Sequence, residues 1–62
     1  MNLSPRQKQV ADLLATGMSN KQIARKIGLA EGTVKFHVMR IFERVGARNR
    51  TEAALTLRGA QQ

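Results

Sequence analysis

The chain has 62 residues, enough for one domain with a modest hydrophobic core. It contains no cysteine, which excludes disulfide bridges and cysteine-ligated zinc as sources of stability. Lysine and arginine number 11 against 4 aspartate and glutamate, and the net charge of +7 predicts a polyanionic partner: nucleic acid, anionic lipid or an acidic protein.

Apolar segments are short throughout the chain. The run Ala53–Leu55 is far below the roughly 20 residues of a membrane span, and the first residues lack the apolar core of a signal peptide. We therefore expect a cytoplasmic protein that does not bind a membrane.

The first predicted helix covers about residues 5–16. Ser4 precedes it as an N-cap, Pro5 suits the first helical position, and Gln7 has the spacing of a capping box. Gly17 ends the helix. The apolar stripe consists of Val10, Leu13 and Leu14.

The second predicted helix, about residues 20–27, repeats this pattern. Ser19 and Gln22 form its capping box, and Gly28 ends it. A tight turn leads from there to a longer helix. A short helix, a glycine-containing turn and a longer helix form a helix-turn-helix signature.

The third predicted helix, about residues 31–45, has two apolar faces. Its core face consists of Val34, Val38, Ile41, Phe42 and Val45. Phe36 and Met39 lie on the opposite side, among basic residues. They either pack elsewhere in the chain or are simply exposed, as single apolar residues often are, or they face a partner. Thymine methyl groups in a DNA major groove and a helix of another protein are both candidates.

The fourth predicted helix covers about residues 50–58, with Asn49 and Glu52 as a third capping box. The sequence shows no strand pattern and no linker. It therefore predicts a single all-α domain over residues 1–62, a four-helix bundle that contains a helix-turn-helix.

Two helix starts carry residues suited to phosphate. Ser19–Lys21 begin the second helix, where free N–H groups and the positive helix end favour an anion. Capping alone is the other explanation. Arg48, Arg50 and Thr51 surround the start of the fourth helix and could hold a second phosphate, although an arginine there is usually solvated.

No catalytic or metal-binding constellation is visible. His37 is the single histidine, and metal ligands normally occur in clusters. A phosphate neighbour and a partly buried helix residue remain equal explanations for it. We expect no enzyme activity, no metal, no cofactor and no small-molecule ligand.

Three segments carry a resemblance to a known family: LSPRQKQV, LLATGMSNKQIARKIGLAEGTVKFHV and IFERVGARNRTEAAL. They span about Leu3 to Leu57 and resemble the C-terminal DNA-binding domain of the LuxR family of bacterial transcription regulators, which includes the NarL/FixJ response regulators. The resemblance implies that the third helix is the recognition helix. It also implies a response-regulator output domain that binds double-stranded DNA sequence-specifically as a homodimer, with RNA polymerase as a further candidate partner.

The resemblance assigns roles to individual residues. The positions that match base-reading residues are Lys35, Phe36 and Met39. The candidate contacts to the DNA backbone or groove edge are Ser19, Asn20, Lys21, Thr33, His37, Arg40, Arg48, Arg50 and Thr51. The candidates for the dimer interface on the fourth helix are Leu55, Thr56 and Arg58. We expect the isolated chain to be monomeric at micromolar concentration.

Four positions depart from the family pattern, and two of them, Gln7 and Gln9, stand where Glu is common in the family. Ala30 stands where a Ser or Thr cap is common, and the loss of such a cap typically costs about 1 kcal/mol. Met39 is apolar where some members carry a polar or basic residue. This difference bears on the target sequence and not on the mode of binding.

Two other functions stay open. A protein-interaction module would use Phe36 and Met39 to anchor a partner helix. A promoter-binding domain of the sigma-factor type would share the helix-turn-helix pattern, but the segment RTEAAL argues against it because such a domain needs no dimerising helix. Salt separates the first alternative from DNA binding, because phosphate contacts weaken steeply with salt.

Overall fold

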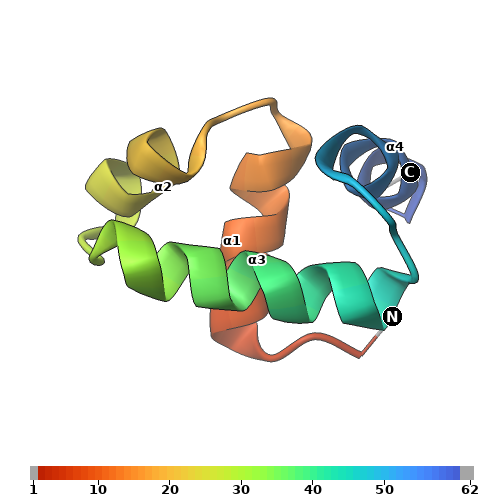
Figure 1. Cartoon of the computed structure of the whole chain (residues 1–62), viewed down its shortest axis with the longest axis horizontal. Coiled ribbons are helices and arrows are strands. Elements are labelled where there is room, and N and C mark those ends of the chain that lie inside the picture. Colours follow the sequence, from red (N-terminus) through yellow and green to blue (C-terminus); the bar gives the residue numbers. More distant parts are fainter. Residues whose placement is uncertain (1, 61–62) are drawn as a thin grey trace.

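The structure is a computed structural model that describes residues 2–60 as four helices joined by short loops (Figure 1). The helices are α1 (Pro5–Ala15), α2 (Asn20–Ile27), α3 (Glu31–Val45) and α4 (Arg50–Ala60). No strand occurs within residues 2–60, and the predicted all-α fold class is confirmed.

Two of the three predicted capping boxes form completely. At α1, Ser4 Oγ accepts from the Gln7 N–H and the Gln7 side-chain oxygen accepts from the Ser4 N–H, both at 3.1 Å. Ser19 and Gln22 repeat this at α2, at 3.2 and 2.9 Å. Each box satisfies two of the N–H groups that a helix start leaves without partners.

For the third capping box, one of the two predicted hydrogen bonds forms and the other does not. Asn49 Oδ1 accepts from the Glu52 N–H at 2.8 Å, as expected. The Glu52 carboxylate instead accepts from the Arg48 N–H at 3.0 Å. The chain bends at Arg48 and Asn49, and the Arg48 guanidinium lies 3.5 Å from the same carboxylate. The Glu52 carboxylate thus interacts with two donors of Arg48 and does not accept from the Asn49 N–H, which the full capping box requires.

Two helix ends differ from prediction by one or two residues. α1 ends at Ala15, where the prediction continued to residue 16, and the Thr16 hydroxyl donates to the Leu13 carbonyl in the last turn at 2.6 Å. α4 continues to Ala60, two residues beyond its predicted end. Gly28 and Gly46 end α2 and α3 as expected, both at φ +71°, a left-handed conformation that glycine adopts without strain.

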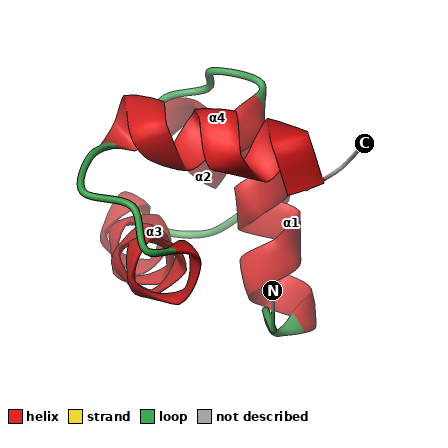
Figure 2. Cartoon of the chain, turned by 90° about the vertical axis from the view of Figure 1, so that its right-hand side faces the viewer, coloured by secondary structure: helices red, strands yellow, loops and turns green. Residues whose placement is uncertain are grey.

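All four helices contribute to one core. Figure 2 shows α4 crossing α1, with α3 seen end-on, and Figure 1 shows α2 beside the start of α3 and α4 beside its end. The core cluster consists of Val10, Ala11, Leu14, Ala15, Ile23, Ala24, Val34, Val38, Ile41, Ala53 and Leu57. The predicted core face of α3 is confirmed, with Phe42 and Val45 partly buried against the cluster. The other side of α3 is left to solvent.

Candidate nucleic-acid interface

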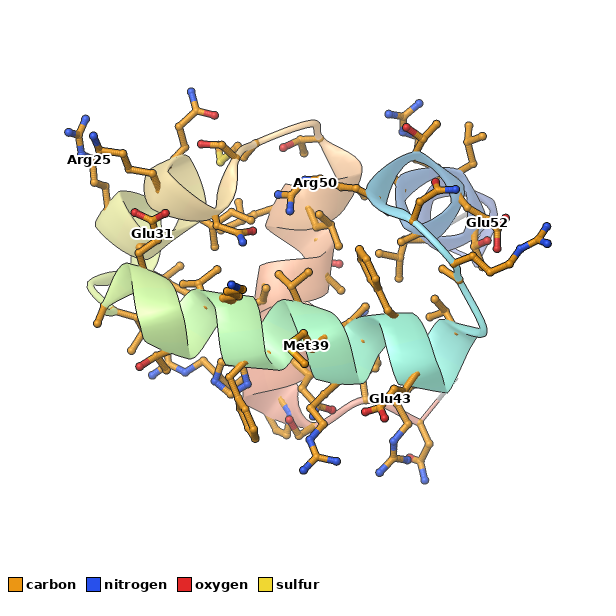
Figure 3. All side chains as sticks on the ribbon, viewed as in Figure 1. Arg25, Glu31, Met39, Glu43, Arg50 and Glu52 are labelled. Carbon is orange, nitrogen blue, oxygen red and sulfur yellow. The ribbon has the colours of Figure 1, made fainter. Side chains whose placement is uncertain are left out.

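The solvent-facing side of α3 carries two large apolar side chains. Phe36 is 54% exposed and Met39 58%, and Figure 3 shows Met39 on the side of α3 that faces the viewer. Residues three apart are neighbours on a helix surface, and the exposed side chains of Lys35 and Arg40 flank the pair. The prediction that Phe36 and Met39 lie outside the core is confirmed. Of the possibilities left open, packing of these two side chains into another part of residues 2–60 is excluded by their exposure.

Arg40 has two side-chain neighbours on this face. Its guanidinium carbon lies 5.1 Å from the centroid of the Phe36 ring, a cation–π distance. A terminal nitrogen lies 3.7 Å from the Glu43 carboxylate. The ion pair is solvent-exposed, so it contributes little to stability. The two contacts instead bring hydrogen-bond donors and an apolar ring to the same place on α3.

His37 lies half-buried at the edge of this face. Its ring meets that of Phe36 edge-on, with centroids 6.1 Å apart. His37 Nδ1 is buried and has no hydrogen-bond partner among residues 2–60. Within the same residues, no three His, Cys, Asp or Glu side chains cluster as a metal site would require.

The start of α2 presents two backbone donors that find no partner within the helix itself. Its first helical hydrogen bond runs from the Ile23 N–H to the Ser19 carbonyl at 2.9 Å, and the capping box uses the N–H of Gln22. The N–H groups of Asn20 and Lys21 therefore stand at the positive end of the helix without partners in it. Lys21 is exposed and Asn20 is half-buried.

The start of α3 is less firmly closed. Ala30 is the N-cap and makes no side-chain cap bond, as its side chain predicts. The N–H groups of Thr33 and Val34 both donate to the Ala30 carbonyl at 3.1 Å. Thr33 is exposed in this first turn, and Glu31 places a negative charge where it complements the helix dipole.

The structure separates the two arginines at the start of α4. The Arg48 side chain is 88% exposed, and Thr51 is exposed beside it. Arg50 instead reaches from α4 across α1 toward α2 (Figure 3). Its terminal nitrogens donate to Asn20 Oδ1 at 2.7 Å and to the Met18 carbonyl at 2.5 Å.

Partial burial also lowers the pKa of Arg50, because loss of water disfavours the charged form. Sequence reasoning missed this inward contact. Its partners lie 30 and 32 residues away along the chain, and no local pattern signals a pairing over that distance.

The exposed side of α4 carries the three candidate dimer residues. Leu55 is 59% exposed and Thr56 is exposed as well. Arg58 is exposed as well, and its Nε donates to the Ala15 carbonyl at 2.9 Å, which also fastens α4 to the end of α1.

No helix within residues 2–60 has the length and apolar character needed to cross a lipid bilayer. Exposed cations thus lie on the outer side of α3, at Lys35 and Arg40, and at the starts of α2 and α4, at Lys21 and Arg48. We refer to the outer side of α3, with Lys35, Phe36, Met39 and Arg40, as the α3 face.

Comparison with known proteins identifies relatives of the whole bundle. Residues 1–57 match the family described as "Bacterial regulatory proteins, luxR family". The chain is 43% identical over 56 residues to a putative HTH-type transcriptional regulator, YhjB, of Escherichia coli, covering 90% of this chain and 28% of the relative.

Two further relatives are named as response regulators. The two-component response regulator PprB of Pseudomonas aeruginosa is 46% identical over 55 residues, covering 89% of this chain and 20% of the relative. The nitrate/nitrite response regulator protein NarL of Escherichia coli is 40% identical over 53 residues, covering 86% and 24%.

The chain thus spans between 20% and 28% of the length of these relatives. Its own sequence is matched almost from end to end, and all four helices fall largely within the matched residues. The chain belongs to the luxR family of bacterial regulatory proteins, a helix-turn-helix family of DNA-binding transcription regulators.

Proposed function

We propose that this chain, as a single domain, binds double-stranded DNA sequence-specifically and serves as the output domain of a bacterial response regulator. The observation that carries the proposal is the α3 face, where cations and two half-exposed apolar side chains share one side of a helix whose other side is core. The relatives named as response regulators support the regulatory context.

In this proposal α3 enters the major groove. Its 15 residues extend about 22 Å, and a major groove is wide enough for a helix. Phe36 and Met39 then meet thymine methyl groups. Lys35 donates to guanine O6 or N7, which are the acceptors that a lysine reads most often.

Backbone contacts position α3 from both sides. The free N–H groups of Asn20 and Lys21 and the Lys21 ammonium form one phosphate site, with Ser19 holding the helix end. Arg48 and Thr51 form a second at α4, while Thr33, His37 and Arg40 lie at the groove edge. Such contacts supply much of the affinity and fix the register, whereas base contacts select the sequence.

The remaining assignments complete the proposal. A homodimer assembles on DNA through Leu55, Thr56 and Arg58 on α4, and the isolated chain is monomeric at micromolar concentration. The domain acts in the cytoplasm without catalysis, cofactor or small-molecule ligand. Contact with RNA polymerase is a further part of its role in transcription.

A protein-interaction module is the second candidate, because Phe36 and Met39 are more than half exposed. Binding of the 62-residue chain to a fluorescent random duplex, measured by anisotropy over a range of salt, separates the two. Neutralising four to six phosphates predicts a slope of log K against log salt of about −4 to −5. Absence of binding at low salt would refute the DNA proposal and favour an apolar partner.

A further inference from the structure

Arg50 joins three parts of the chain at one point. It is the first residue of α4, and its guanidinium meets the Met18 carbonyl in the α1–α2 loop and the side chain of Asn20, the first residue of α2. Figure 3 shows the Arg50 side chain extending from the start of α4 across α1. The start of α4 is therefore fastened to the start of the helix-turn-helix.

The chemistry of this contact fixes the direction of the Asn20 amide. A guanidinium has only donors, so the atom of Asn20 that faces it must be the acceptor Oδ1. Because the amide is planar, Nδ2 and its two hydrogens point away from Arg50. No residue within 2–60 accepts a hydrogen bond from Nδ2. The Asn20 backbone N–H is also unpaired in α2, so two kinds of donor stand together at the positive end of the helix.

Arg50 itself is badly placed to act as a surface cation. It is half-buried, and two terminal nitrogens are engaged within the protein. Lys21 and Arg48 are exposed by contrast, and among residues 2–60 neither side chain makes such a contact to another helix.

We propose that Arg50 is a positioning residue for a DNA phosphate at the start of α2. It turns the Asn20 side-chain amide outward as a donor and holds the α1–α2 loop, so that the amide and the first backbone N–H groups of α2 meet the same phosphodiester. Asn20 touches the phosphate, and Arg50 acts through Asn20. This inference rests on the proposed DNA-binding function.

The test is a double-mutant cycle on affinity for a random duplex. Arg50→Lys keeps the charge but cannot form the two-armed contact, and Asn20→Ala removes the amide. Each single variant should bind about 3–10-fold more weakly, the value of one lost hydrogen bond. The double variant should bind no more weakly than the weaker single variant. Arg25→Lys is the matched control, an exposed arginine outside the proposed DNA contacts whose charge is kept, and should change affinity by less than about 2-fold.

Salt dependence separates the proposed positioning role of Arg50 from a direct contact between Arg50 and a phosphate. Arg50→Met removes the charge, yet it should leave the slope of log K against log salt as in the unsubstituted chain, because Arg50 releases no counterion. Lys21→Ala should reduce the steepness of that slope by about 0.9, the value for one phosphate contact. Circular dichroism at the assay temperature confirms that every variant is folded.

Four results would overturn the inference. Additive losses in the cycle, or a reduced slope for Arg50→Met, would make Arg50 a direct phosphate cation. A lower melting temperature for Arg50→Lys with unchanged affinity would leave it a structural contact only. If the unsubstituted chain fails to bind the duplex at low salt, the proposed function fails, and the role of Arg50 fails with it.

Discussion

The uncapped start of α3 can be repaired by one substitution. Ala30 has φ −68° and ψ 146°, close to the values of the two capping serines, −65° and 161° at Ser4 and −74° and 164° at Ser19. A serine at position 30 therefore needs no change of backbone to bring its Oγ to the N–H of Thr33. That N–H now has only the Ala30 carbonyl, at 3.1 Å. We expect Ala30→Ser to raise the free energy of unfolding by about 1 kcal/mol.

The magnitude is large for so small a domain. For a domain of 62 residues, a gain of 1 kcal/mol in stability raises the melting temperature by about 4–8 °C. Thermal unfolding followed by circular dichroism measures it, with Ala30→Val as the control, because valine fits the same extended backbone at this exposed position but offers no acceptor. Equal melting temperatures for the serine variant, the valine variant and the unsubstituted chain would refute the reasoning.

The remaining predictions concern the two sides of α3 and its flanks. Ile41→Ala should lower the free energy of unfolding, measured in urea, by about 2–5 kcal/mol, because Ile41 is fully buried. Met39→Ala should change it by less than about 0.5 kcal/mol and should weaken DNA binding instead. Similar losses of stability in the two variants would contradict the assignment of one side of α3 to the core and the other to DNA. Lys21→Ala should weaken binding to all duplexes about equally, and a loss confined to one sequence would exclude its phosphate role. On a selected high-affinity duplex, replacing thymine by uracil should weaken binding of the unsubstituted chain but not of Phe36→Ala, and equal sensitivity of the two proteins would show that Phe36 does not read a methyl group.

Local patterns were sufficient for the helices and for the face that α3 buries. The capping serines and glutamines bond to residues only three positions away, and each glycine ends its helix at its own position. The spacing of apolar residues along α3 likewise needs no information from the other helices. The bounds of α2 and α3 therefore follow directly from sequence. The exposure of Phe36 and Met39 follows from the same spacing, which puts them on the side of α3 opposite the core.

Contacts between distant residues could not be predicted in this way. Arg50 and Arg58 each appear as ordinary cations on an exposed helix until their partners, 30 and 43 residues away, are placed beside them. Both turn a guanidinium inward to an acceptor at the start of α2 or the end of α1. The direction of the Glu52 side chain also depends on a bend at Arg48 that its spacing from Asn49 does not reveal.

The most direct test of the central claim is a titration of the isotope-labelled chain with a short random duplex, followed through its amide NMR shifts at low and physiological salt. We predict shifts at Asn20, Lys21, Lys35, Phe36 and Met39 that diminish as salt rises, with little change at the buried residues of α1. Absence of shifts at both salts, or shifts confined to other faces, would contradict DNA recognition by the α3 face.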